Sequence, residues 1–520
     1  MLGVLIIISS IATLIYLKLI QRPPNFPPGP RGIPILGNLL QIGQSPFLKF
    51  QNEWKAKYGP IIGLYFGSFR TVAISDYRMI RQALLDPLLS GRPDMLMWHV
   101  RSRDTQGRGQ PTTAVIIFHQ RLKRASATFP PGILFTQGEE HTEQRRIALK
   151  SLKDFGYGMK SFENIVTAEI SSFLLRMENS VGVPIYLKNK FHVPLLSILW
   201  HVVAGRDCEE DKHTLYEIFS KSTKIMEENN GLSALFMFIP WLCKYFPAIS
   251  GYDKLNSELE DIWAFLQTHI DDHKRDHVNS PLTFHDFIGA YIHEMEKTTD
   301  PTSSFFKRAG DRGLMSSLID LFFAGTDTLA GTLHWSMLIF AKYPEIQQKF
   351  ADEIENVIGT RTPEQNDEPN MPYTQALINE ILRYTSIAPL AIFHNAMQDV
   401  RFHGYDIQKD TMVLLNLHGA HHDKNYWGDP EKIRPERFLA ADGTTPVKHE
   451  AFLAFGAGKR LCVGEAMGRK ELFLFLTSIV QNFRISTDPD NPNPNLDPTV
   501  SFILMPPNHR MIFEKRVTNV

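Results

Sequence analysis

One cysteine near the C-terminal end of the chain lies in a glycine-rich segment, FGAGKRLCVG, which runs from Phe455 to Gly464. Glycines let the backbone approach closely and present amide donors to the sulfur of Cys462. Lys459 and Arg460 precede the cysteine, and an apolar helix is predicted to begin beside it, which favours the thiolate form. No second cysteine or histidine stands at zinc spacing nearby. One axial thiolate on haem iron therefore explains the segment better than a tetrahedral site, and a small buried core cysteine is the simpler alternative.

The spacing Phe-x-x-Gly-x-Arg-x-Cys-x-Gly resembles the cysteine loop of the cytochrome P450 family. Phe455, Gly458, Arg460, Cys462 and Gly464 stand at the family's positions. The resemblance implies haem b (iron protoporphyrin IX) as the cofactor and Cys462 as the axial ligand of its iron. It also implies that Phe455, Gly458 and Arg460 help to bind the haem.

The composition is that of a globular protein with a large core. The chain has 520 residues, of which 43% are hydrophobic and 21% charged. A net charge of −1 gives no support to a nucleic-acid partner. Only 3 cysteines are present, which argues against a disulfide framework and for a reducing, cytosolic compartment.

The N-terminal end of the chain is predicted to be a membrane anchor. Residues 2–17 carry no charge, and the apolar run reaches Ile20 if Lys18 extends to the membrane surface. That length is close to the roughly 20 residues that a membrane-spanning helix needs. A cleaved signal peptide is the alternative, but the run lacks a preceding basic segment and a small-residue cleavage site. Basic residues follow the run, so the rest of the chain is expected in the cytosol.

A proline-rich segment, Pro23 to Pro30, follows the apolar run. Proline cannot continue a helix, so this segment is expected to act as a stiff spacer. The sequence therefore predicts a membrane anchor (1–21), a proline-rich linker (22–32) and one haem-thiolate catalytic domain (33–520). This order resembles the microsomal members of the family, which implies a single-pass protein of the endoplasmic reticulum membrane.

The remaining pattern predicts a mainly α fold with a small β-sheet subdomain, which matches the family fold. Two strands are predicted at 61–66 and 70–74, and further strands near 399–407 and in the last twenty residues. Helical periodicity dominates after Gly138 and predicts helices over 138–153, 160–179, 190–205, 212–228, 252–277, 310–341, 344–358, 373–385 and 462–483.

Two segments stand apart from this pattern. Residues 233–249 are rich in Phe, Trp and Leu and are broken by two prolines, so they form either a buried loop or, as in the family, a segment that dips into the bilayer. The predicted anchor favours the second alternative. Residues 101–131 are longer than the family pattern and strongly basic. Three explanations are open for these residues: a solvated insertion, a basic loop that faces the membrane, or an error in the gene model, such as a retained intron.

The helix predicted over 310–341 is interrupted by the segment AGTDT, from Ala324 to Thr328. An acid and a hydroxyl are costly inside an apolar helix, although a kink with satisfied polar side chains would explain them. The resemblance places this segment over the haem. It implies that Ala324 and Gly325 leave room for dioxygen, and that Asp327 and Thr328 are the catalytic residues that relay protons to it.

Glu380 and Arg383 share one face of a predicted helix, and Arg437 follows within the segment PERF. An exposed ion pair would contribute little. The family resemblance instead implies a buried charge triad of Glu380, Arg383 and Arg437 with a structural role around the cysteine loop.

The haem propionates require hydrogen-bond donors. By resemblance, Arg460, Arg145 and His394 are the expected donors. His141 stands where the family usually has tryptophan, four residues before Arg145. Imidazole can still donate an N–H group to a propionate, but it covers less of the propionate than indole does.

His418, His421 and His422 are close in sequence, but no carboxylate or further histidine completes a metal site. We therefore interpret them as structural residues of a family loop. A second set of residues predicts a basic face that could bind an acidic electron donor: Lys459, Arg145, Arg146, Lys150 and Lys153. Ordinary solvated surface charge is the alternative.

The residues of these motifs resemble those of the microsomal branch, which contains drug- and steroid-metabolising enzymes and their arthropod counterparts. It implies a monooxygenase that inserts one oxygen atom from dioxygen into a lipophilic small molecule, such as a steroid, terpenoid, fatty acid or xenobiotic. Electrons would come from NADPH through cytochrome P450 reductase, with cytochrome b5 as a second donor. The apolar pocket candidates are Leu321, Ala324, 388–392 and 502–504.

Two alternatives remain at this stage. One is a haem-thiolate isomerase or dehydratase, which would act on a peroxide and tends to lack the acid–threonine pair. The other is a non-catalytic relative that binds lipophiles or haem, altered by His141 and by the long stretch 101–131.

Overall fold

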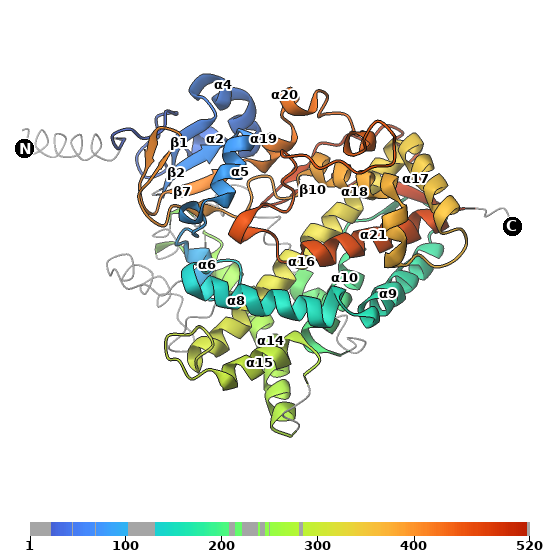
Figure 1. Ribbon diagram of the computed structural model, residues 1–520, viewed down its shortest axis with the longest axis horizontal. Coiled ribbons are helices and arrows are strands. Elements are labelled where there is room, and N and C mark those ends of the chain that lie inside the picture. The colour runs from blue at the N-terminus through green and yellow to red at the C-terminus, as the bar shows by residue number, and fades with distance from the viewer. Residues whose placement is uncertain are drawn as a thin grey trace, which may run out of the picture.

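The computed structural model of the protein describes residues 22–43, 45–67, 69–101, 131–206, 214–220, 238–239, 245–248, 250–279 and 284–516. The predicted anchor and most of segments 101–131 and 233–249 lie outside the described residues. Among the residues that are described, no helix has the length and apolar character needed to cross a bilayer. This part of the chain is mainly helical with small sheets, as predicted (Figure 1).

The N-terminal part combines short helices with the largest sheet. Its helices are α2 (Leu39–Ile42), α3 (Pro46–Leu48), α4 (Lys55–Tyr58), α5 (Tyr77–Leu85) and α6 (Leu96–Val100). The sheet has the strand order β1 (Ile61–Phe66), β2 (Phe69–Ile74), β7 (Met412–Leu415) and β4 (His394–Asn395). Strands β1 and β2 form an antiparallel hairpin, whereas β2 pairs with β7 in parallel, so distant parts of the chain meet in one sheet.

The helical part contains the longer helices. They are α8 (Gly138–Ser151), α9 (Lys160–Glu178), α10 (His192–Ala204), α14 (Tyr252–Asn279), α15 (Phe287–Lys297), α16 (Arg308–Lys342), α17 (Pro344–Val357), α18 (Pro372–Thr385) and α21 (Glu465–Asn482). Two short helices, α19 (Leu417–His421) and α20 (Lys424–Trp427), lead towards the cysteine segment.

Three small sheets complete the described fold. One has the order β3 (Ile185–Tyr186), β11 (Arg510–Lys515) and β8 (Phe483–Thr487). The hairpins β5 (Val400–Phe402) with β6 (Tyr405–Ile407), and β9 (Thr499–Val500) with β10 (Leu504–Met505), form the other two.

Helix α16 is the central helix of the fold. It is 35 residues long and buries side chains around most of its circumference, as expected for a helix inside a large core. It contacts α10, α14, α18 and α21 and crosses the middle of the molecule in Figure 1, where it is yellow. The AGTDT segment of α16 therefore lies in the interior.

Most predicted elements are confirmed with small shifts at their ends. The helix predicted over 462–483 begins at Glu465, and the helix predicted over 212–228 is described only at 214–220, where it is helical. The prediction omitted α15 and several strands, among them β3, β4, β7 and β8. The apolar run of β7 is only 4 residues long, and such a short run does not identify a strand by periodicity.

A buried carboxyl group in α21 makes stability depend on pH. Glu471 is 4% exposed, its Oε1 has no hydrogen-bond partner in the described structure, and burial raises its pKa to about 8. The unfolded pKa is about 4.3, so the folded state favours the protonated form. The contribution of protonated Glu471 to the free energy of unfolding is fully present below the unfolded pKa and is lost as pH rises towards about 8.

We expect Glu471→Gln to remove this pH dependence. Between pH 5 and pH 8 the wild-type free energy of unfolding should fall by about 1–4 kcal/mol more than that of the variant. Denaturant unfolding at both pH values measures the difference, with Glu355→Gln on the surface of α17 as the control. Equal pH slopes for wild type and Glu471→Gln would contradict the assignment.

Candidate active site

The cysteine segment is held in a tight backbone conformation before α21. Gly456 and Gly458 have positive φ angles of 75° and 66°. A Cβ atom on Gly458 would overlap the backbone carbonyl oxygen of Leu84 at the end of α5. The N–H of Cys462 donates to the carbonyl of Phe455 at 2.9 Å, which closes the loop. Glycine is therefore required where the segment presses against α5.

The sulfur of Cys462 receives backbone hydrogen bonds from the first turn of α21. Burial and the charge of Glu465 raise the pKa of Cys462, whereas the N–H groups of Gly464 and Glu465 and the charge of Arg145 lower it. The thiol itself is accessible, so the loop leaves the sulfur open to a ligand. Arg145, rather than the adjacent Lys459 or Arg460, is the cation with the largest effect on the sulfur. A bound metal ion would supply the remaining stabilisation of the thiolate.

A cluster of cationic side chains gathers around His141. Burial lowers the pKa of His141 to about 3, and Arg460, Arg92, Arg145 and Lys459 lower it further, so the imidazole is neutral. Burial and the charge of Arg145 lower the pKa of Arg460 to about 9. The site therefore carries positive potential close to the cysteine segment, where an anionic group would be stabilised.

Arg460 is only partly satisfied by protein. Its Nε donates to the carbonyl of Ser90 at 2.8 Å, and its Nη2 donates to the carbonyl of Thr136. Its Nη1 is buried and has no hydrogen-bond partner among the described residues. An unpaired guanidinium donor in a cationic cluster fits the carboxylate of a haem propionate.

His394 lies at the same edge on β4, but its geometry limits its predicted role. Its Nδ1 is 2.9 Å from the carbonyl oxygen of Leu89. A carbonyl only accepts, so Nδ1 carries the hydrogen atom and Nε2 of the neutral ring is an acceptor. Burial, Arg92 and Arg460 hold the pKa of His394 well below its usual range. His394 can donate to a propionate through Nε2 only after it gains a second proton.

Sequence reasoning missed Arg92, whose only signal was its place in the segment GRP after α5. Arg92 is 4% exposed and donates to the carbonyls of Leu134, Ile392 and Phe393. It ties the segment before α8 to the segment before β4. Arg92 therefore positions two walls of the site and adds to the positive potential.

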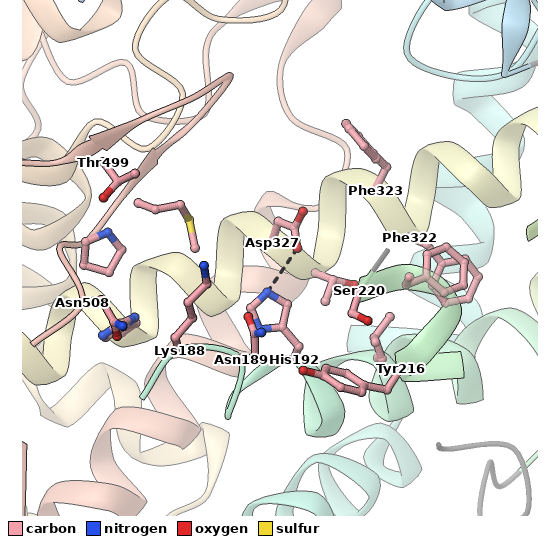
Figure 2. A pocket seen from close by; sticks show the side chains of 16 residues that line it. Lys188, Asn189, His192, Tyr216, Ser220, Phe322, Phe323, Asp327, Thr499 and Asn508 are labelled. Atoms are coloured by element: carbon pink, nitrogen blue, oxygen red, sulfur yellow. Dashed lines mark ion pairs between the residues drawn. The ribbon is translucent and has the colours of Figure 1, made fainter. Parts of the chain in front are cut away.

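The predicted catalytic pair is divided between two faces of α16. The hydroxyl of Thr328 donates to the carbonyl of Ala324 at 2.7 Å. Asp327 points towards α10, and its Oδ1 lies 3.2 Å from Nε2 of His192 (Figure 2). Gly325 has no side chain, and among the described residues an added Cβ would approach only Leu199 on α10. His192 had not been singled out in the sequence because its partner lies far along the chain.

The predicted charge triad is present and buried. Glu380 accepts two hydrogen bonds from Arg383, at 2.7 and 2.8 Å, and one from Nε of Arg437 at 3.0 Å. The backbone N–H of Arg434 also donates to Glu380, at 2.9 Å. The side chains of Glu380 and Arg383 are fully buried. The triad joins α18 to the PERF segment.

His421 connects this triad to the cysteine segment. Arg383 donates to the carbonyl of His421 at 2.8 Å, and the backbone N–H of Leu453 donates to Nε2 of His421 at 3.0 Å. Nδ1 of His421 therefore carries the hydrogen atom and donates to the hydroxyl of Ser386, 2.7 Å away. His418 and His422 stack on each other with ring centroids 4.0 Å apart. These contacts agree with the structural interpretation of the three histidines.

The described ends of the long stretch 101–131 meet at one carboxylate. Asp320 of α16 forms an ion pair with Arg101 at 2.6 Å and accepts hydrogen bonds from the N–H groups of Ile133 and Leu134. Arg101 therefore belongs to a buried contact and not to a basic surface. Sequence reasoning overlooked Asp320, although an acid inside an apolar helix was a signal.

Two of the predicted substrate-pocket segments, 388–392 and 502–504, meet in one apolar cluster, whereas Leu321 packs against the larger helical core. Leu390 and Leu504 are buried in this cluster, and Phe393 and Phe502 have ring centroids 5.8 Å apart. Of the predicted basic face, Lys150, Lys153 and Lys459 are exposed, Arg146 pairs with Glu294, and Arg145 faces the cysteine segment.

The residues present fit a haem group. The accessible thiol of Cys462 with two backbone N–H donors suits an iron ligand, and the unpaired donor of Arg460 in a cationic cluster suits a propionate. When bound, haem would be held by Cys462 and by cations such as Arg460 and Arg145.

Comparison with known proteins agrees with this site. The cytochrome P450 family profile matches residues 27–115 and 118–513. "Cytochrome P450 2B2" of Rattus norvegicus is 33% identical over 499 residues, covering 95% of this chain and 94% of the relative. "Farnesoate epoxidase" of Bombyx mori is 31% identical over 501 residues, with the same shares of each chain covered. "Cytochrome P450 2J2" of Homo sapiens is 32% identical over 499 residues, covering 94% of this chain and 91% of the relative. The chain therefore belongs to the cytochrome P450 family, the haem-thiolate monooxygenases that act on lipophilic substrates.

Proposed function

We propose that Cys462 is the axial ligand of haem iron and that the protein uses electrons from NADPH, delivered by cytochrome P450 reductase, to oxygenate a lipophilic substrate. The observation that carries this proposal is the accessible sulfur of Cys462 with its two backbone N–H donors. Haem, when bound, supplies dioxygen activation and oxygen transfer. The protein supplies the sulfur ligand, the cations for the propionates and the proton donors.

Thr328 and Asp327 are the proposed proton donors. The hydroxyl of Thr328 donates to the backbone carbonyl of Ala324, so it can donate a hydrogen bond to a ligand only after it turns away from this contact. Asp327 faces the other side of α16, beside His192. Asp327 would thus take protons from that side, and Thr328 would present them to dioxygen.

The proposed substrate is an apolar small molecule. The cluster formed by residues 388–393 and 502–504 carries aromatic and aliphatic side chains, which would shield the apolar surface of a bound substrate from water. A relative from Bombyx mori is named for the epoxidation of farnesoate. We infer that steroids, terpenoids, fatty acids and xenobiotics of similar size are the class to screen.

The proposed location is the endoplasmic reticulum membrane, with residues 1–21 as the anchor and 33–520 as the catalytic domain. The uncharged run before Lys18 and the resemblance of the motifs to the microsomal branch of the family support this proposal. Exposed Lys150, Lys153 and Lys459 would bind an acidic surface of the reductase, with cytochrome b5 as a second donor.

We expect Thr328→Ala to uncouple electron use from oxygenation. Product formed per NADPH should fall at least about tenfold, because general acid assistance is lost, while NADPH oxidation continues. Reconstitution with reductase and a turned-over substrate measures both rates. Thr332→Ala is the matched control, since Thr332 makes the same kind of bond one turn later, to the carbonyl of Thr328 at 2.8 Å.

The same variant tests the isomerase alternative. An isomerase acts on a peroxide without reductase and would keep its rate in Thr328→Ala. Unchanged coupling in Thr328→Ala would contradict the proton-donor role of Thr328. If wild type and Thr328→Ala formed product from a peroxide at the same rate, the isomerase alternative would be favoured.

A further inference from the structure

Trp98 of α6 carries a buried hydrogen-bond donor without a partner. Its side chain is 2% exposed, and Nε1 of its indole ring has no hydrogen-bond partner in the described structure. A buried tryptophan usually finds an acceptor for this N–H group, because an unpaired buried donor destabilises the folded state. The unpaired indole of Trp98 therefore requires an explanation.

The indole of Trp98 lies in the apolar cluster that contains the proposed substrate segments. Leu390 and Phe393 belong to this cluster from the first segment, and Leu504 belongs to it from the second. Arg92 precedes α6 in the chain and donates to the carbonyl of Phe393 at 3.1 Å. The segment that leads into α6 is therefore fixed against the wall of the proposed substrate site.

Trp98 is held in place by stacking. Its indole stacks on Phe135, with ring centroids 3.8 Å apart and an interplanar angle of 15°. The guanidinium of Arg101 lies over the same phenyl ring, 4.5 Å from its centroid. Because the indole covers one face of the phenyl ring, the guanidinium occupies the other face. Arg101 pairs with Asp320 at 2.6 Å, which anchors the stack to α16.

The same carboxylate places the stack beside the AGTDT segment. Asp320 accepts a hydrogen bond at 2.9 Å from the N–H of Leu134, the neighbour of Phe135. Asp320 precedes Ala324 by about one helical turn, so these two residues share a face of α16. The stack therefore borders the side of α16 that carries Ala324, where dioxygen is proposed to bind.

The surroundings of the indole select the chemistry of an acceptor. Apolar side chains surround it, and the charge of Arg101 is balanced by Asp320 on the other side of the Phe135 ring. A carboxylate buried against one uncharged donor would lack a counter-ion, whereas a carbonyl or ether oxygen is satisfied by a single donor. A buried water molecule needs about two to four polar partners and suits an apolar cluster poorly.

We propose that the indole N–H of Trp98 binds the substrate, and that the substrate is an apolar molecule with a neutral acceptor oxygen, such as the carbonyl of a ketone or an ester. This inference rests on the proposed function, because it assigns the apolar cluster to the substrate. It narrows the substrate class from lipophilic molecules in general to those that carry such an oxygen. One hydrogen bond would orient such a molecule between walls that are otherwise apolar.

Calorimetric titrations of the full haem-loaded protein with matched ligand pairs test this proposal. Hexanophenone and decanophenone are the ketones, and hexylbenzene and decylbenzene are hydrocarbons with the same carbon skeletons. In Trp98→Phe the ketones should bind about three- to tenfold more weakly than in wild type, because one hydrogen bond is lost. The hydrocarbons should bind both proteins equally well, because they make no hydrogen bond.

Trp54→Phe is the matched control. Trp54 is buried in the same apolar cluster, but its indole N–H is not an unpaired buried donor of the described structure. This variant should keep the wild-type ratio of ketone affinity to hydrocarbon affinity. Thermal unfolding confirms that both variants are folded.

An infrared measurement detects the hydrogen bond itself. Difference spectra of ketone with and without carbon-13 at the carbonyl isolate the carbonyl band of the bound ligand. We expect this band at lower frequency in wild type than in hexane, and near its frequency in hexane in Trp98→Phe. A purely structural role of Trp98 would not shift this band. The wild-type spectrum keeps the test valid if Trp98→Phe does not fold.

A ratio of ketone affinity to hydrocarbon affinity that is the same in wild type and Trp98→Phe would overturn the proposal. A wild-type carbonyl band at its frequency in hexane would overturn it as well, and so would a failure of both ketones to bind. Neither measurement requires electrons or turnover. A negative result therefore leaves the proposed monooxygenase function intact, and absence of turnover with reductase leaves both measurements valid.

Discussion

Replacing Cys462 with serine should abolish the carbon monoxide band of a haem-thiolate protein and reduce oxygenation to background. Serine preserves the size of the side chain but replaces the soft sulfur ligand with a hydroxyl that is not ionised at neutral pH. The N–H groups of Gly464 and Glu465 would then have no thiolate to stabilise. Haem content, the carbon monoxide spectrum and product formation measure the loss.

Cys208→Ser is the control for this substitution, because it makes the same chemical change elsewhere in the chain. It should keep the band and the activity. A Cys462→Ser variant that keeps a thiolate spectrum would show that another residue binds the iron.

Replacing Arg383 with methionine should produce the second large effect, a loss of about 3–5 kcal/mol in the free energy of unfolding. Methionine fills similar space but leaves the buried carboxylate of Glu380 without its two hydrogen bonds from Arg383. It also removes the donor to the carbonyl of His421. Because His421 accepts from the N–H of Leu453, haem retention should fall together with stability.

Denaturant unfolding of the haem-loaded protein and the haem-to-protein ratio measure this effect. Arg434→Met is the matched control, since its side chain is 51% exposed and pairs only at the surface, with Asp429. That change should cost less than about 1 kcal/mol. Equal destabilisation by both variants would contradict the special role of the buried triad.

The sequence predicted the elements whose signals are local. The Glu380–Arg383 pair shares a helix face, and the cysteine loop is a continuous segment with glycines at required positions. The long apolar run of α16 was equally clear. In each case the residues that determine the structure lie within a few turns of one another.

The sequence could not predict contacts between distant segments. Arg92 binds carbonyls about 300 residues later, and Asp320 joins Arg101, at the start of the stretch 101–131, to Ile133 just beyond its end. His192 and Asp327 meet only because α10 packs against α16. Such pairs depend on how helices pack, and no local periodicity encodes them. The tautomer of His394 likewise followed only from its contact with the carbonyl of Leu89.

The carbon monoxide difference spectrum of the dithionite-reduced wild-type protein tests the central claim most directly. An intact Cys462 thiolate on haem iron predicts a Soret band at about 450 nm. A band at about 420 nm, or no band, would contradict the proposal that Cys462 holds haem iron as a thiolate in this protein.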